Sequence, residues 1–153
     1  MPQSLIRACL VVAPLLHGHQ TVGEAVRLLA GQELPALPVV DDTERLTGIF
    51  GEREFIAALF PQYLGTLRSA AFVRASLDDA LERRLPCRDE PVSRHTNTEH
   101  VDVPEDVSDV QLAETFLHHR VLIAPVVRDG QPVGVVPRSS FFRALAARLD
   151  ELG

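Results

Sequence analysis

The chain has 153 residues, 46% of them hydrophobic, and a net charge of −6 at pH 7, which is typical of an ordinary folded domain. No apolar run reaches the roughly 18 residues of a membrane span. All 15 basic residues are arginines, but they form no basic stripe, so binding to nucleic acid is not expected. Cys9 and Cys87 match no metal or redox spacing, which fits a reducing cytoplasm.

The first predicted elements are a strand, a helix and a second strand. The apolar run LVVAPLL (10–16) predicts a short strand. Thr21, with Glu24 three residues later, has the pattern of a capping box, and the apolar residues behind it recur at helical spacing. The run ALPVV (36–40) is too short for a helix and predicts a buried strand.

A hairpin and a closing helix come next. The turn DDTE (41–44) is short enough only for an antiparallel hairpin. Pro38 has no N–H to donate to a strand ladder, so we expect it at a strand start or on an edge. The segment IFGEREFIAAL (49–59) then enters a helix, and Pro61 is expected to stop it.

A connector separates this first unit from the rest of the chain. The segment SLDDALERRL, which begins with a cap pattern at Ser76, predicts a helix that packs onto the core. The polar segment 88–97 is the expected joint. We therefore divide the chain into a first unit (1–60), a helical connector (61–98) and a second unit (99–153).

The second unit repeats the order of signals in the first. Pro125-Val126-Val127 aligns with Pro38-Val39-Val40, and Ser108 with Gln111 forms another capping box upstream. Such a repeat means that one structural unit is used twice.

The remaining elements of the second unit follow from the same alignment. EHVDVP (99–104) predicts its first strand, and RDGQ (128–131) predicts its hairpin turn, because Asp-Gly suits a primed turn. Pro125 is expected at a strand start or on an edge, as Pro38 is. LAARLDELG (145–153) predicts an amphipathic helix end.

The segments LPVVDDTERLTGIFGEREFIAAL and APVVRDGQPVGVVPRSSFFRAL resemble the two halves of a tandem cystathionine-β-synthase (CBS) domain pair, or Bateman module. The resemblance covers about 10–60 and 88–148. It implies a mixed α/β (α+β) fold, in which two β-α-β-β-α units are related by a pseudo-twofold axis. It also implies a homodimer, and a cleft between the halves that binds AMP, ATP or a related adenosine ligand.

In that family a Thr or Ser hydroxyl starts the last helix of each half, and an Asp follows three residues later. The hydroxyl reaches a phosphate at the helix N-terminus, and the carboxylate accepts from the ribose hydroxyls. This chain departs from the pattern. Gly51 and Pro137 stand at the hydroxyl positions, and Glu54 and Ser140 stand at the carboxylate positions.

Of these, Glu54 alone keeps a charge, so the first half is expected to dominate any nucleotide binding. Arg53 and Arg138, next to the helix starts, could hold a phosphate directly, or they could be solvated surface arginines. Glu54 itself has a structural alternative, as the second half of a capping box. The ligand-binding positions that the resemblance implies are Pro38, Gly51, Arg53, Glu54, Pro125, Arg138 and Ser140.

The histidines and the apolar helix faces have simpler interpretations. The pairs His17/His19, His95/His100 and His118/His119 fit surface or capping roles better than a metal site, which needs three or four converging ligands. An apolar face over two helices is predicted to pair two copies. Its residues are Phe55, Leu59, Phe142 and Leu145.

The sequence therefore predicts a non-enzymatic regulatory module with no catalytic residue and no metal. In the first hypothesis it senses an adenosine-type nucleotide, such as AMP or ATP, in the cleft. In the second it is a ligand-free dimerisation or protein-interaction module whose nucleotide sites have degraded. The expected partners are a second copy and an unidentified regulated protein, with no nucleic acid and no membrane, in the cytoplasm.

Overall fold

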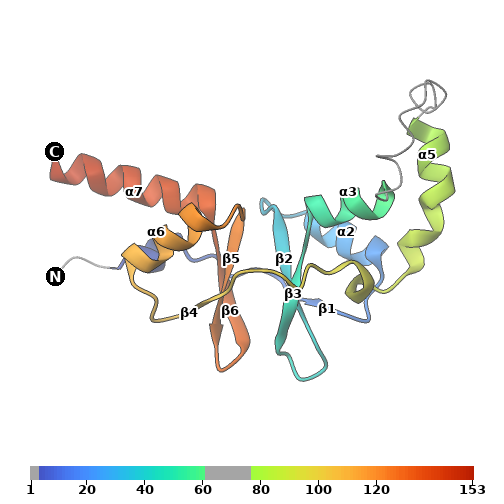
Figure 1. Ribbon diagram of the computed structural model, residues 1–153, viewed down its shortest axis with the longest axis horizontal. Helices are drawn as coiled ribbons and strands as arrows, with labels where there is room; N and C mark the ends of the chain where they lie inside the picture. The colour runs from blue at the N-terminus through green and yellow to red at the C-terminus, as the bar shows by residue number, and fades with distance from the viewer. Residues whose placement is uncertain (1–3, 61–76) are drawn as a thin grey trace.

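The computed structural model describes residues 4–60 and 77–153 and forms two lobes, each built on a three-stranded sheet (Figure 1). The predicted helix stop at Pro61 and the predicted cap at Ser76 lie outside the described residues. In Figure 1 the first repeat unit lies in the right-hand lobe and the second repeat unit lies in the left-hand lobe.

The first lobe contains one complete β-α-β-β-α unit. Its elements are β1 (Leu16–His17), α2 (Val22–Ala30), β2 (Ala36–Val40), β3 (Leu46–Gly51) and α3 (Glu52–Leu59). The strands lie in the order β1-β2-β3, with β1 parallel and β3 antiparallel to β2.

The second lobe repeats the arrangement of the first. Its elements are β4 (Val103–Pro104), α6 (Asp109–His118), β5 (Ile123–Arg128), β6 (Gln131–Pro137) and α7 (Arg138–Leu152). The order β4-β5-β6 has the same parallel and antiparallel pairing. The predicted α+β fold of two β-α-β-β-α units is therefore confirmed.

Four further short elements complete the described chain: α1 (Leu5–Cys9), α5 (Leu77–Arg84) and the 3-10 turns η2 (Leu85–Asp89) and η3 (Val92–His95). Although α1 is N-terminal, it packs in the second lobe against α7. Its buried side chains belong to the same apolar cluster as Phe141 of α7. The helix α5 packs beside α3 in the first lobe.

The segments that lead into the two units cross between the lobes in a reciprocal way. Val11, which precedes the first unit, exchanges two backbone hydrogen bonds of 2.8 Å with Val135 of β6. Asn97, which precedes the second unit, does the same with Ile49 of β3, at 2.8 and 3.0 Å. Each lobe thus carries a bridge from the other half, as the pseudo-twofold arrangement requires.

The prediction that the two repeat prolines lie at a strand start or on an edge is wrong. Pro38 and Pro125 lie within β2 and β5, the middle strands of the two sheets. The crossing bridges explain why this is tolerated. Ile49 and Val135, which lie opposite the prolines, direct their own backbone groups to Asn97 and Val11.

The position opposite each proline is therefore a non-hydrogen-bonded one, and the missing N–H is not needed there. The parallel strands β1 and β4 lie on the other side of the middle strands. Their pairing begins one residue after each proline, at Val39 and at Val126. No ladder hydrogen bond is lost at either proline within the described sheets.

The sequence patterns correctly predicted where α2 and α6 begin and where the second hairpin turns. The Ser108–Gln111 capping box is complete, with both hydrogen bonds 3.1 Å long. At Thr21 the hydroxyl accepts from the Glu24 N–H at 3.1 Å, but the reverse bond is absent among the described contacts. Asp129 and Gly130 both have positive φ, of 53° and 81°, as a primed turn demands.

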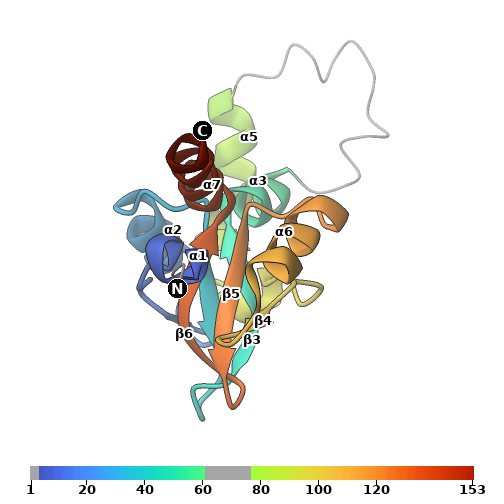
Figure 2. The same ribbon diagram turned by 90° about the vertical axis from the view of Figure 1, so that its left-hand side faces the viewer.

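The leading strands are much shorter than expected and lie at the ends of the predicted runs, as β1 and β4 show. The two hairpin tips meet at one end of the molecule (Figure 2), where the Leu46 N–H donates to the Gly130 carbonyl at 2.9 Å. At the opposite end, helices α3 and α7 begin beside the junction of the two lobes (Figure 1).

Candidate functional site: two clefts at the junction of the lobes

The larger hollow at the junction has a volume of about 870 Å³ and lies at the start of α3; we call it the α3 cleft. One wall is the junction of β3 and α3 in the first unit. The other wall is the end of α6 and the start of β5 in the second unit. Its lining includes Ile49, Arg53, Glu54, Asn97, Glu99, Val101, His118, His119, Arg120 and Val121.

The α3 cleft brings together two of the residues that sequence analysis selected, Arg53 and Glu54. Glu54 is half-buried, and its Oε1 accepts a hydrogen bond from the backbone N–H of Gly51 at 3.0 Å. Arg53 is exposed at the same helix start. Glu54 therefore caps α3, the structural alternative considered above, and also lines the cleft.

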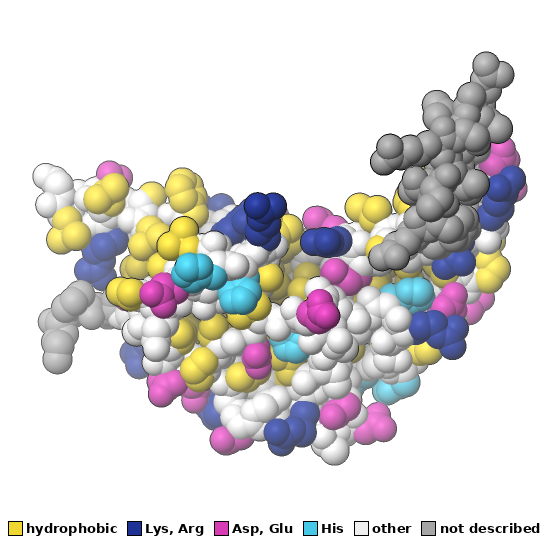
Figure 3. Space-filling view, viewed as in Figure 1, with side chains coloured by type: hydrophobic (Ala, Val, Ile, Leu, Met, Phe, Trp, Pro, Cys, Tyr) yellow, Lys and Arg dark blue, Asp and Glu magenta, His cyan; other side chains and the backbone are white. Residues whose placement is uncertain are grey.

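The opposite wall was not predicted as part of a site. His118 ends α6 and His119 is its C-cap residue, which fits the predicted capping role. Both side chains are exposed and, with Arg120, line the α3 cleft. Figure 3 shows histidine (cyan) and arginine (dark blue) side chains around the middle of this face. Their position at the end of a helix was readable from the sequence, but their convergence on α3 was not.

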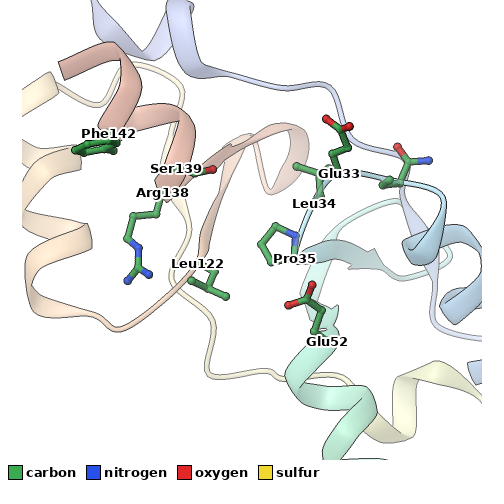
Figure 4. A pocket seen from close by; sticks show the side chains of 9 residues that line it. Glu33, Leu34, Pro35, Glu52, Leu122, Arg138, Ser139 and Phe142 are labelled. Atoms are coloured by element: carbon green, nitrogen blue, oxygen red, sulfur yellow. The ribbon is translucent and has the colours of Figure 1, made fainter. Parts of the chain in front are cut away.

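A second hollow of about 650 Å³, the α7 cleft, lies at the start of α7 and is shown in Figure 4. Arg138 and Phe142 lie on one side, and Glu33, Pro35 and Glu52 lie on the other. Because α7 and α3 are equivalent elements of the repeat, the two clefts are pseudo-symmetric counterparts.

Of the remaining predicted site residues, only Arg138 lines one of the two clefts. Pro38 and Pro125 are buried inside the sheets. Ser140 is half-buried on the first turn of α7, whereas its neighbour Ser139 is among the residues that line the α7 cleft. Arg138 is exposed and lines the α7 cleft. The second cleft thus offers a guanidinium but no carboxylate at the position that matches Glu54.

Gly51 is held as glycine by close packing. It is the N-cap residue of α3 and is buried. A Cβ at this position would collide with the Pro35 carbonyl oxygen and with the Ala36 side chain. The same backbone approach lets the Glu52 N–H donate to the Pro35 carbonyl at 3.0 Å. A serine or threonine hydroxyl therefore has no room at this helix start.

Comparison with known families decides what kind of module this is. The family model for the CBS domain matches the chain twice, at residues 13–61 and 92–147. The chain belongs to the CBS-domain family. It is a tandem CBS pair, and proteins of this family are generally regulatory and not catalytic. The comparison with curated protein sequences found no match.

Solved structures agree on the fold of the CBS pair. A CBS domain-containing protein from Kribbella flavida has a TM-score of 0.71 at 22% identity, covering 95% of this chain and 99% of its own. An acetoin utilization protein (AcuB) from Vibrio cholerae has 0.70 at 20% identity, covering 99% and 96%. The protein CBSX2, solved in complex with AMP, has 0.69 at 18% identity, covering 96% and 98%.

Three further features of the described part of the CBS pair concern metal sites, reactive thiols and membrane-spanning helices. Residues 4–60 and 77–153 contain no group of three or more His, Cys, Asp or Glu side chains that could hold a metal ion. Burial raises the pKa of the Cys9 and Cys87 thiols, which keeps both protonated at neutral pH. None of the described helices combines the length and apolarity needed to cross a membrane.

Proposed function

We propose that this CBS pair is a non-enzymatic regulatory module that binds an adenosine-type nucleotide, such as AMP or ATP, in the α3 cleft. The observation that carries the proposal is the position of Arg53 and Glu54 at the start of α3, on one wall of a hollow of about 870 Å³. Ligand pockets typically measure about 300–1,000 Å³. The AMP complex of CBSX2 supports the choice of ligand class.

The geometry at α3 suits the two halves of a nucleotide. The N-terminus of this eight-residue helix attracts a phosphate through its dipole, and the exposed Arg53 adds a full charge. The Oε1 atom of Glu54 holds the Gly51 N–H. Its Oε2 atom, which has no partner among the described residues, is the acceptor proposed for a ribose hydroxyl.

The α7 cleft is proposed to bind the same ligand more weakly or to stay empty. Ser140 can offer one neutral hydrogen bond where Glu54 offers a charged one. A hydrogen bond to a charge contributes about 1.5–3 kcal/mol and a neutral one about 0.5–1.5 kcal/mol. We therefore expect one nucleotide per chain.

Isothermal titration of the purified protein with AMP and ATP, together with a thermal-shift screen of adenosine compounds, tests this proposal. The expected result is saturable binding with one site per chain. A ligand at about 100 times its Kd should add about 2.7 kcal/mol to the free energy of unfolding. If no adenosine compound gives either heat or a shift, the nucleotide proposal is wrong.

The alternative is a ligand-free dimerisation or protein-interaction module, and one observation favours it. Four apolar side chains of α7 are exposed at helical spacing: Phe142 (68%), Leu145 (42%), Leu149 (73%) and Leu152 (78%). Such a stripe usually marks an interaction surface. We propose that a second copy covers it, and an unidentified regulated protein is the next candidate.

We also propose that the module works in the reducing cytoplasm. Both cysteines are free and buried, on α1 and in η2 respectively, so neither is placed to form a disulfide with the other. The net charge of −6 adds no attraction for nucleic acid or for an anionic membrane surface.

A further inference from the structure

A smaller hollow of about 360 Å³ adjoins the α3 cleft, and it is rich in basic side chains. We call it the arginine pocket. Its lining comprises Arg53, Glu54, Ala57, Ala58, Arg84, Arg94, His95 and Thr96. Arg53 and Glu54 line both the pocket and the α3 cleft, so the two spaces meet at the start of α3.

The cations of this pocket come from three separate elements. Arg53 lies on α3, Arg84 ends α5, and Arg94 and His95 lie in η3. Arginine side chains (dark blue) and histidine side chains (cyan) are visible on the face of this lobe in Figure 3. Only the fold brings them together, since Arg84 and Arg94 belong to the segment that joins the two units.

Arg84 is fixed in place by the end of α3. Its Nε and Nη2 atoms donate to the Ala58 carbonyl oxygen at 3.1 and 2.8 Å. A guanidinium in this position also offsets the negative end of the helix dipole. Its Nη1 atom makes no hydrogen bond within the described residues, so it can donate into the pocket.

Arg94 and His95 are oriented by one shared carboxylate. The Arg94 Nη1 and the His95 Nε2 atoms each lie 3.1 Å from Oε2 of Glu90. This leaves the Nε and Nη2 atoms of Arg94 without a partner in the part of the chain that the structure describes. The His95 side chain is only 17% exposed, whereas that of Arg94 is 64% exposed and accessible to a ligand.

The balance of charge in the pocket favours an anion. Three guanidinium groups face two carboxylates, Glu54 on the lining and Glu90 behind it, and one of those carboxylates already caps α3. Guanidinium groups recognise phosphate oxygens through paired, charge-assisted hydrogen bonds. Guanidinium groups from three elements therefore line one space of about 360 Å³.

We propose that the arginine pocket binds phosphate, and that it receives the outer phosphates of a nucleoside diphosphate or triphosphate whose nucleoside lies in the α3 cleft. The second clause rests on the proposed function, because it takes the α3 cleft as the nucleoside site. The first clause concerns the pocket alone. On this basis the preferred ligand carries a phosphate chain longer than that of AMP.

Isothermal titration of the full chain with ATP, AMP and inorganic triphosphate tests this, using Arg94→Gln and the matched control Arg83→Gln. Arg83 is exposed on α5 outside the pocket, so its variant removes the same charge without touching the pocket. We expect wild type to bind ATP more tightly than AMP by at least about 10-fold, which is the low end of what one hydrogen bond to a charged group contributes. Arg94→Gln should abolish this preference, and Arg83→Gln should keep it.

The three ligands separate this inference from the proposed function. One possible result is that inorganic triphosphate binds, that Arg94→Gln weakens its binding by about 10-fold, and that no adenosine compound binds. This result would support the phosphate pocket and contradict the nucleoside site. The inference is overturned if wild type binds AMP and ATP equally. It is also overturned if Arg94→Gln and Arg83→Gln behave alike, or if neither ATP nor inorganic triphosphate binds.

Discussion

The carboxylate of Glu54 and the backbone N–H of Gly51 are joined by a hydrogen bond of 3.0 Å across the first turn of α3. Glu54 therefore contributes to the stability of the helix whether or not a ligand is present. Any test of its role in binding must separate these two contributions. The chemistry of the side chain allows this, because a glutamine can keep the capping bond and lose the charge.

We predict that Glu54→Gln and Glu54→Ala weaken nucleotide binding to a similar extent but differ in stability. Loss of the charged acceptor should cost about 1.5–3 kcal/mol of binding free energy in both. Only Glu54→Ala should also lower the free energy of unfolding, by about 0.5–2 kcal/mol, as loss of a cap does. Urea denaturation and isothermal titration with ATP measure the two effects.

The matched control is Ser140→Ala, which changes the corresponding position of the second unit and should leave nucleotide affinity unchanged. Wild-type affinity in Glu54→Gln would show that the carboxylate does not contact the ligand. An equal loss of stability in both Glu54 variants would show that the capping bond needs the charge.

We predict that placing the family's hydroxyl at Gly51 will damage the protein instead of improving the site. Gly51→Ser adds a Cβ that collides with the Pro35 carbonyl and the Ala36 side chain. Overpacking of this kind costs about 1–3 kcal/mol. The equivalent change in the second unit, Pro137→Ser, should cost less than about 1 kcal/mol, because serine is a good N-cap residue. Urea denaturation of both variants checks the contrast.

If Gly51→Ser unfolded at the same urea concentration as wild type, the chain at Pro35 would have to move aside without penalty. In that case nucleotide affinity should rise, because the new hydroxyl would lie at the helix start. A stable Gly51→Ser protein with unchanged nucleotide affinity would show that the start of α3 does not contact the ligand.

The features that sequence analysis predicted well are those with local signals. The capping box at Ser108, the turn at Asp129-Gly130 and the two hairpins depend on residues close together in the chain, and the repeat supplied each signal twice. The position of Pro38 was predicted wrongly because the proline rule concerns missing donors. The rule does not apply at a strand position that makes no ladder hydrogen bond, and the sequence does not show which positions these are.

Long-range pairing had no signal in the sequence. The bridges from Val11 to β6 and from Asn97 to β3 join segments from opposite halves, and neither segment has a pattern that names its partner. The same limit applied to the site. A motif at the helix start identified Arg53 and Glu54. His118 lines the α3 cleft and Arg94 lines the arginine pocket only because α6 and η3 fold back toward α3.

We predict that Glu90 gives the protein a stabilising contribution that disappears in acid. Burial raises the pKa of this carboxyl, but hydrogen bonds from His95 and Arg94 outweigh burial and leave the pKa below its ordinary value of 4.5. A carboxyl with a lowered pKa in the folded state stabilises the protein above its ordinary pKa, and the contribution is lost as pH falls below that value.

The measurement is urea denaturation of wild type and Glu90→Gln at pH 7 and at pH 3.5. The difference in stability between the two proteins should be larger at pH 7 and should shrink in acid. Glu114→Gln, which changes an exposed glutamate on α6, supplies the background. A difference that stayed constant, or that grew in acid, would show that the Glu90 cluster is not held by charge.

The last prediction concerns the exposed stripe of α7 and its burial against a second copy. Phe142, Leu145, Leu149 and Leu152 are exposed by 42% to 78%, whereas Phe55 and Leu59 of the predicted dimer face are half-buried in the first lobe. Among the described residues, the helix α7 therefore carries four of the twelve large apolar side chains that are exposed, and these four lie on one side of the helix. A twofold interface would place the same stripe on both sides, which is the commonest way in which identical chains pair.

Light scattering at micromolar concentration should give about twice the chain mass of 16.8 kDa. Leu149→Glu puts a charge into the paired stripe and should shift the protein to monomer. Ala147→Glu adds the same charge on a different side of α7 and should leave the dimer intact. A wild-type monomer would refute the dimer outright. Burying an unpaired carboxylate costs far more than exposing one, so only Leu149→Glu should disrupt a dimer built on this stripe. If the two variants had the same mass in solution, the interface would lie elsewhere.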